Sequence, residues 1–171
     1  MNKNILGIFA MLLSAVFMFS SCKKDKDNNS TNDGSYRENK EKGEKYLIKK
    51  REAEGVRQSS TGLLFKIEEL SSETDVRPEI DDSCVARIRC ERFDGICFSD
   101  TTYKFLINDQ IKGVQEGLSY MTPGSKMELF IPYYLGFGTV STKYYFKNKT
   151  ITILPYTALH VNVELQKVIK H

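Results

Sequence analysis

The residues best able to do chemistry in this sequence are four cysteines and two histidines. Metal sites need closely spaced ligands such as Cys-x2-Cys, and neither histidine lies near Cys84, Cys90 or Cys97 in the sequence. Cys84 and Cys90 fall an even number of positions apart on one predicted strand, so they share a face but lie too far apart for a disulfide. We interpret the three as small packing residues, while a bridge from Cys97 to one of the others stays open. The histidines form no catalytic triad pattern.

The fourth cysteine, Cys22, follows a segment with a different chemistry. Lys3 gives a positive start, and the almost unbroken apolar run Ile5–Phe19 is too short to span a bilayer, which needs about 20 residues. Such a run is typical of a secretory signal peptide, and the small residues directly before Cys22 resemble a bacterial lipobox. We therefore predict a lipoprotein signal peptide over residues 1–21 and a lipid on Cys22. The alternative is an ordinary signal peptide with an unmodified thiol.

The segment after Cys22 and the overall charge suggest where the protein acts and what it does not bind. Residues 22–37 are nearly free of apolar side chains, so we predict a disordered tether, with Lys23 compatible with sorting to the outer membrane. We expect a lipid-anchored protein of the cell envelope, on the periplasmic or surface face. The net charge of +3 comes with no basic stripe, and Gly136-Phe137-Gly138 lacks the surroundings of a phosphate loop. These features argue against nucleic acid and nucleotide ligands.

Hydrophobic periodicity predicts the elements that position the remaining residues. Residues 38–55 are rich in lysine and glutamate and predict a helix that Gly55 ends. Apolar residues at helical spacing predict a second, amphipathic helix over residues 111–121, with Asn108 and Asp109 as capping residues. Alternating apolar residues predict strands over the segments Thr61–Glu69, Cys84–Phe93, Tyr103–Ile107, Met127–Ile131 and Leu159–Gln166. Many strands around one central helix indicate an α+β domain.

The order of several short motifs resembles the FKBP-type peptidyl-prolyl isomerases. These motifs are Asp94-Gly95 followed by Phe98, Gly113–Met121 followed by Pro123-Gly124-Ser125-Lys126, Leu135–Gly138, and Ile153–Leu159 followed by Val161–Leu165. The junction from Tyr46 to Leu63 is similar to that of exported, Mip-like members. The resemblance implies an FKBP-like domain over residues 56–171. Its antiparallel sheet of about five strands would wrap around one central helix, with a short helix before it.

The same resemblance implies an isomerase that needs no cofactor, metal or nucleotide. Rotation about a peptide bond costs ~18–20 kcal/mol because it breaks amide resonance, and only X-Pro bonds populate both isomers appreciably. The twisted amide is less dipolar than the planar one, so a dry apolar pocket favours the transition state over the ground state. The expected substrates are proline-containing unfolded or newly exported polypeptides.

The resemblance also assigns pocket residues. Phe98 and Tyr103 would be walls, Ile111 would offer its backbone N–H to the substrate carbonyl, and Phe137 would stand where the family has a ligand-binding tyrosine. The other residues expected at the substrate are Ile88, Ser99, Asp100, Phe105, Gln110, Val114, Ile153 and Val161. An alternative for Phe98, Phe105 and Ile111 is a purely structural role in the core.

Several positions depart from the family pattern. Val114 replaces the tryptophan of the pocket floor, Ile88 a tyrosine and Val161 a phenylalanine. Ser99 replaces an aspartate, for which the neighbouring Asp100 could substitute after a one-residue shift. These changes widen the pocket, so a noncatalytic FKBP-fold chaperone or peptide-binding lipoprotein is the alternative function.

The insertion-like stretch Ser141–Thr150 carries three aromatic residues, Tyr144–Phe146, whose role stays open. They would either refill the widened pocket or pack on the sheet edge. A third interpretation is a surface lipoprotein that contacts other envelope proteins through them.

Overall fold

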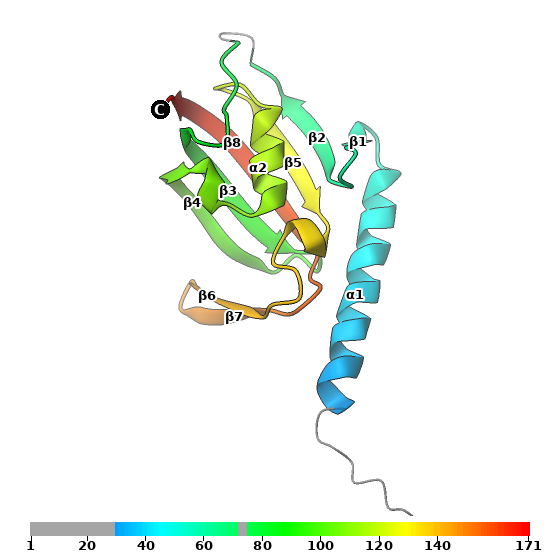
Figure 1. Ribbon diagram of the computed structural model, residues 1–171. Helices are drawn as coiled ribbons and strands as arrows, with labels where there is room; N and C mark the ends of the chain where they lie inside the picture. Colours follow the sequence, from blue (N-terminus) through cyan, green and yellow to red (C-terminus); the bar gives the residue numbers. More distant parts are fainter. Residues whose placement is uncertain (1–29, 72–74) are drawn as a thin grey trace, which may run out of the picture.

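A long N-terminal helix packs beside a curved sheet that wraps around a second, short helix (Figure 1). The structure, a computed structural model, describes residues 30–71 and 75–171, so the predicted signal peptide and Cys22 lie outside the described residues. The N-terminal helix, α1, runs Ser30–Arg51. No helix in these described ranges is long and apolar enough to cross a membrane.

Helix α1 begins earlier than predicted, so residues 30–37 belong to it instead of to a disordered tether. Ion pairs between Lys42 and Glu38 (2.7 Å) and between Lys40 and Glu44 (3.8 Å) link successive turns. Once one part of a helix is fixed by packing, each added residue costs little, which explains the extension into a polar segment. The helix ends at Arg51, and Gly55, the predicted stop, lies in the following turn with a φ of +78°.

The main sheet has six antiparallel strands in the order β1-β2-β5-β8-β3-β4. These strands are β1 (Val56–Gln58), β2 (Leu64–Glu69), β3 (Ser83–Arg92), β4 (Cys97–Leu106), β5 (Lys126–Ile131) and β8 (Leu159–Ile169). All five predicted strands are present, and β1 is an additional short edge strand. Strand β4 begins well before the predicted Tyr103, because its polar first half pairs along β3 as far as Glu91.

A separate two-stranded hairpin lies where the sequence indicated an insertion. It consists of β6 (Thr142–Phe146) and β7 (Lys149–Ile153). Lys147 and Asn148 form its turn with φ values of 48° and 62°. Two residues in the left-handed region are typical of the tight turns that match the twist of a hairpin.

The second helix, α2 (Lys112–Ser119), covers one face of the sheet, and the core lies between them (Figure 1). It is shorter than predicted, because Ile111 and Tyr120 are its caps. Asn108 and Asp109 do not cap it, since they belong to a short 3-10 helix, η1 (Ile107–Asp109). A Cβ at Gly117 would lie 2.6 Å from a methyl carbon of Leu129, so glycine is what allows α2 to approach β5 so closely.

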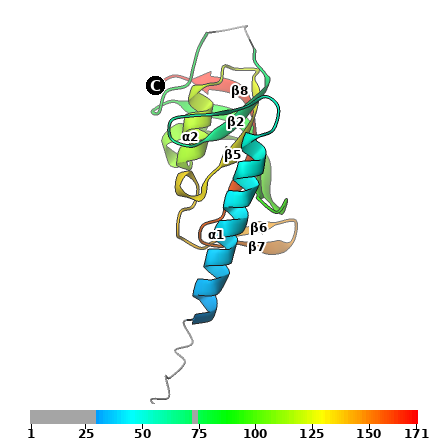
Figure 2. The same ribbon diagram turned by 90° about the vertical axis from the view of Figure 1, so that its right-hand side faces the viewer.

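Helix α1 packs on the opposite face of the sheet. Because side chains alternate along β5, Leu129 and Ile131 point to α2 whereas Phe130 points the other way. There the ring centroids of Phe130 and Tyr46 of α1 lie 6.3 Å apart. Figure 2 shows α1 running past β2 and β5 toward the β6–β7 hairpin. The sheet is therefore covered by a helix on each face.

Candidate functional site

A cavity of about 310 Å³ opens between α2, β3, β4 and the β6–β7 hairpin. Eight of the residues predicted for the pocket line it, namely Ile88, Phe98, Ser99, Tyr103, Gln110, Ile111, Val114 and Phe137. They come from β3, β4, the η1–α2 junction and the loop after β5. The fold thus brings together residues spread over much of the domain sequence.

Three aromatic rings form one wall of this cavity. The centroid of Phe98 on β4 lies 4.9 Å from that of Tyr144 and 6.2 Å from that of Phe137. Phe137 and Tyr144 are 5.8 Å apart, so each ring contacts the other two at a tilted or edge-on angle. Phe98 is only 3% exposed, which makes this wall a fixed apolar surface.

Tyr144 reaches the cavity because the insertion is a β-hairpin. Side chains alternate along β6, so Tyr144 faces the cavity, whereas Tyr145 faces solvent and is 74% exposed. Of the roles left open by the sequence, Tyr144 therefore has that of a residue lining the pocket. The periodicity of Thr142–Phe146 and the turn-forming Lys147-Asn148 were the signals from which the hairpin could have been found.

A small set of polar groups borders the apolar wall. The Tyr103 hydroxyl donates a hydrogen bond to Oε1 of Gln110 at 3.2 Å, and the side chain of Gln115 donates to the backbone carbonyl of Gln110 at 2.6 Å. Burial raises the pKa of the Tyr103 phenol and also that of the Tyr144 phenol. Both hydroxyl groups therefore stay protonated at neutral pH and can donate hydrogen bonds.

The backbone of Ile111 is set for an external hydrogen bond. Ile111 caps α2 in an extended conformation (φ −61°, ψ 149°), and its carbonyl accepts the N–H groups of Val114 and Gln115. Within the part of the chain that the structure describes, no group accepts a hydrogen bond from the Ile111 N–H. A donor at the cavity rim is thus left for a ligand.

Four residues predicted for the pocket do not line the cavity. Asp100 points to the outer face of the sheet, where its carboxylate accepts hydrogen bonds from Arg87 at 3.0 Å and Arg89 at 3.5 Å. Its guanidinium partner Arg87 is the main cause of the lowered pKa of Asp100. Ser99 pairs with Cys90 and lines the cavity, whereas Asp100 pairs with Arg89 and does not, so the one-residue substitution expected for Asp100 is wrong.

The other three are core residues. Ile153 and Val161 are fully buried, and Phe105 packs against Tyr103 with a centroid distance of 4.9 Å. Val161 pairs with Leu129 in the middle of the sheet. Leu159, two residues earlier on the same face of β8, lines the cavity instead.

Cys90 and Asp109 also line the cavity, although the sequence did not indicate a site role for either. Burial raises the pKa of the Cys90 thiol to about 12, so it stays protonated and acts as a small apolar wall residue. Cys84, Cys90 and Cys97 are all free in the structure. The described residues contain no cluster of three or more metal-ligating side chains.

Comparison with known proteins identifies the family. Residues 75–166, more than half of the chain, match the model of the FKBP-type peptidyl-prolyl cis-trans isomerases. This chain belongs to that family.

Individual relatives agree with this assignment. The FKBP-type peptidyl-prolyl cis-trans isomerase FkpA of Aeromonas hydrophila is 31% identical over 106 residues, which cover 59% of this chain and 39% of the relative. The peptidyl-prolyl cis-trans isomerase Mip of Coxiella burnetii is 29% identical over 58% of this chain and 45% of the relative. The chain therefore spans less than half the length of these two curated relatives.

The fold is similar to that of solved FKBP-type structures. The crystal structure of FkpA from Escherichia coli superposes with a TM-score of 0.72 at 27% identity, covering 82% of this chain and 63% of that one. A peptidyl-prolyl cis-trans isomerase from Pseudomonas syringae gives a TM-score of 0.68 at 20% identity over 78% of this chain and 96% of that one, which supports the fold alone.

The FKBP-type cavity of this chain differs from the expected family pattern in its floor. Val114 and Ile88 line it as aliphatic residues where the pattern has aromatic ones, while Val161 lies in the core. Tyr144 supplies aromatic surface from the hairpin instead. The floor of this FKBP-type site is thus less aromatic than the family pattern, whereas its side wall includes the additional ring of Tyr144.

Proposed function

We propose that the chain is a peptidyl-prolyl cis-trans isomerase that acts on proline-containing unfolded or newly exported polypeptides. The observation that carries the proposal is the cavity walled by Phe98, Phe137 and Tyr144, with the unpaired N–H of Ile111 at its rim. A proline ring packs against the aromatic wall, and the Ile111 N–H binds a substrate carbonyl. These contacts position one X-Pro bond beside the aromatic wall.

Catalysis in such a site needs no nucleophile. The planar amide is stabilised by its dipole in water, and it loses that stabilisation in an apolar cavity. The twisted amide has less charge separation, so it loses less of this stabilisation than the planar amide does. The barrier of ~18–20 kcal/mol to rotation is therefore lowered. The neutral hydroxyl of Tyr103 donates its one proton to Gln110, and its oxygen can accept a hydrogen bond from a substrate N–H.

We propose the cell envelope as the place of action, with a lipid on Cys22 as the anchor. The support is the apolar run followed by small residues and Cys22. Labelling cells with a radioactive fatty acid tests this: the wild-type chain acquires label and Cys22→Ser does not. A labelled Cys22→Ser chain, or an unlabelled wild type, contradicts the anchor.

A noncatalytic chaperone is the second candidate function. Val114 and Ile88 favour it, because an aliphatic floor grips a proline ring less firmly than an aromatic one. Two assays on the same preparation separate the candidates: isomerisation of a short prolyl peptide, and suppression of aggregation of an unfolded protein. The isomerase proposal expects acceleration in the first assay. Suppressed aggregation without any acceleration supports the chaperone instead.

A further inference from the structure

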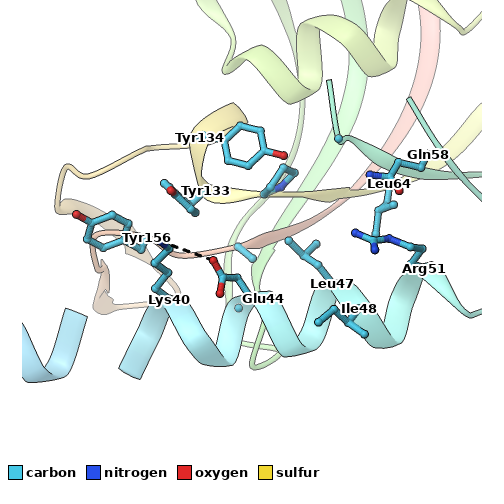
Figure 3. A pocket seen from close by; sticks show the side chains of 14 residues that line it. Lys40, Glu44, Leu47, Ile48, Arg51, Gln58, Leu64, Tyr133, Tyr134 and Tyr156 are labelled. Carbon is cyan, nitrogen blue, oxygen red and sulfur yellow. Dashed lines mark ion pairs between the residues drawn. The ribbon is translucent and has the colours of Figure 1, made fainter. Parts of the chain in front are cut away.

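A second cavity, of about 330 Å³, lies between α1 and the loop that follows β5 (Figure 3). One wall comes from α1, with Lys40, Leu47, Ile48 and Arg51. The facing wall consists of tyrosines 133, 134 and 156, and Leu64 lies at the end near Arg51. We call this cavity the helix groove; the isomerase cavity described above does not share its lining residues.

The helix groove is held open by a rigid contact on one side. The Asn39 side chain of α1 is buried and donates hydrogen bonds to the Pro155 carbonyl at 2.8 Å and to Oγ1 of Thr157 at 2.9 Å. One turn later, a Cβ at Gly43 would lie 3.2 Å from Cβ of Ala158, so the helix backbone closely approaches the residue just before β8. Because α1 is fixed at this point, the groove is preformed and binding requires no rearrangement of the helix.

The groove exposes large apolar side chains to solvent. Ile48 on α1 is 52% exposed and Tyr134 on the opposite wall is 55% exposed, although both belong to one concave surface. Contiguous apolar surface of this kind is typical of sites that bind another molecule. A linear, partly apolar ligand would bury both side chains at once.

Tyr156 is held in an unfavourable backbone conformation at this surface. Its φ is 63°, in the left-handed region that bulky residues avoid, and its N–H donates to the Gly138 carbonyl at 2.8 Å. The Tyr156 ring packs edge-on against Tyr133 with a centroid distance of 5.1 Å. Backbone strain of this type collects at ligand sites, and here it places an aromatic ring on the groove wall.

The charges of the groove favour an acidic ligand. The Lys40 ammonium lies 5.6 Å from the ring centroid of Tyr133 and 5.8 Å from that of Tyr156, and it is also 3.8 Å from the Glu44 carboxylate. At the other end, Arg51 forms no ion pair with any described residue, whereas the adjacent Lys50 lies over the Phe130 ring, outside the groove. A carboxylate bound near Arg51 would complement this end.

The helix groove and the isomerase cavity share a structural wall. Tyr133 and Tyr134 face the groove, whereas Phe137 of the same loop lines the isomerase cavity. Likewise, Ala158 lines the helix groove, and the adjacent Leu159 lines the isomerase cavity. The two sites therefore lie on opposite sides of the loop after β5.

We propose that the helix groove binds a stretch of a partner polypeptide. That stretch is extended and carries a large apolar or aromatic side chain next to an acidic residue. This site does not depend on the proposed isomerase function.

Binding of a fluorescein-labelled, proline-free peptide with phenylalanine, leucine and aspartate residues tests the site on the full chain. Fluorescence anisotropy is expected to detect binding, and Ile48→Glu is expected to weaken it about ten-fold, because it places a charge on the apolar wall. Tyr134→Ala, on the facing wall, is expected to weaken it as well. The matched control is Ile96→Glu, which changes an exposed isoleucine of the β3–β4 turn that lines neither cavity.

A second peptide tests the expected preference of the helix groove for acidic ligands. Replacing the aspartates of the peptide by asparagines is expected to weaken binding about three-fold and to reduce its salt dependence. The proposal is overturned if Ile48→Glu binds the acidic peptide as tightly as wild type does. It is also overturned if sedimentation shows that the groove pairs with a second copy of the chain and that Ile48→Glu breaks this dimer.

The test keeps the two proposals apart because the peptide contains no proline. Wild-type protein is assayed in parallel with a short prolyl peptide. If the wild type does not accelerate isomerisation of the prolyl peptide but binds the proline-free peptide in a way that depends on Ile48, the isomerase function is contradicted and the groove proposal is supported. Isomerase activity without peptide binding contradicts the groove alone.

Discussion

The ring of Tyr144 lies 4.9 Å from the ring of Phe98, so a residue of the β6–β7 hairpin completes the aromatic wall that a main-sheet residue begins. The two residues are far apart in the sequence, and only the hairpin brings Tyr144 to the cavity. This pair supplies aromatic surface in a site whose floor residues, Val114 and Ile88, are aliphatic.

Removing the Tyr144 ring is expected to lower isomerase activity. We expect Tyr144→Ala to reduce kcat/KM for a short prolyl peptide about ten-fold, because the proline ring loses one of its aromatic contacts. Tyr144→Phe should retain most of the activity. The matched control is Tyr145→Ala, since Tyr145 belongs to the same strand but is turned to solvent. Equal activity of Tyr144→Ala and Tyr145→Ala contradicts this role.

The rate of isomerisation should not depend on pH between about pH 6 and 9. Burial raises the pKa of the phenols of Tyr103 and Tyr144 above the ordinary value of 10.0 and that of the Cys90 thiol to about 12, so none of them loses its proton in this range. A protease-free assay at constant ionic strength measures the profile. A bell-shaped curve or a step near neutral pH indicates acid–base catalysis and contradicts the mechanism.

The contact between α1 and the domain should contribute to stability. Asn39→Ala removes both side-chain hydrogen bonds and leaves the Pro155 carbonyl without that partner, so we expect the free energy of unfolding to fall by about 1–3 kcal/mol. Urea denaturation measures the change. Lys42→Ala, which removes an exposed ion pair of the same helix, is the control and should cost less than about 0.5 kcal/mol beyond its change in helix propensity. An equal effect of both variants shows that α1 does not dock at Asn39.

Asp82 should make the fold sensitive to acid. Its carboxylate accepts the Glu79 N–H at 2.7 Å and pairs with Lys170 at 2.9 Å, and these interactions, the Glu79 hydrogen bond first, lower its pKa. The stabilisation is therefore complete above the unfolded pKa of about 3.9 and is lost as the pH falls through the lower folded value. Asp82→Asn should be less stable than wild type at pH 7, and the difference should shrink with acid. A difference that stays constant down to pH values near 3 contradicts the linkage.

Much of the fold could be predicted from local patterns. Alternation placed all five predicted strands, and the spacing of Val114 and Leu118 placed α2, because a half-buried strand and an amphipathic helix each have a period set by their own geometry. The order of motifs then indicated the pocket residues, of which Phe98 and Ile111 are examples.

The remaining features depend on long-range contacts. The outward direction of Asp100 follows from its pairing with Arg89 across β3 and β4, a register that includes a bulge at Cys90/Glu91. Val161 and Leu159 share one face of β8, and only the position of α2 and the hairpin decides which of them reaches the cavity. The early start of α1 likewise depends on docking at Asn39, which no local pattern records.

The central claim is that an aromatic, water-poor cavity lowers the barrier to rotation of an X-Pro bond. Magnetisation-exchange NMR on a short prolyl peptide, with and without protein at micromolar concentration, measures this most directly. We predict that the wild type accelerates the exchange between cis and trans. The kcat/KM of Phe98→Ala should be about 100-fold lower than that of the wild type, with circular dichroism confirming that the variant is folded. No acceleration by the wild type, or equal rates for wild type and Phe98→Ala, contradicts the account.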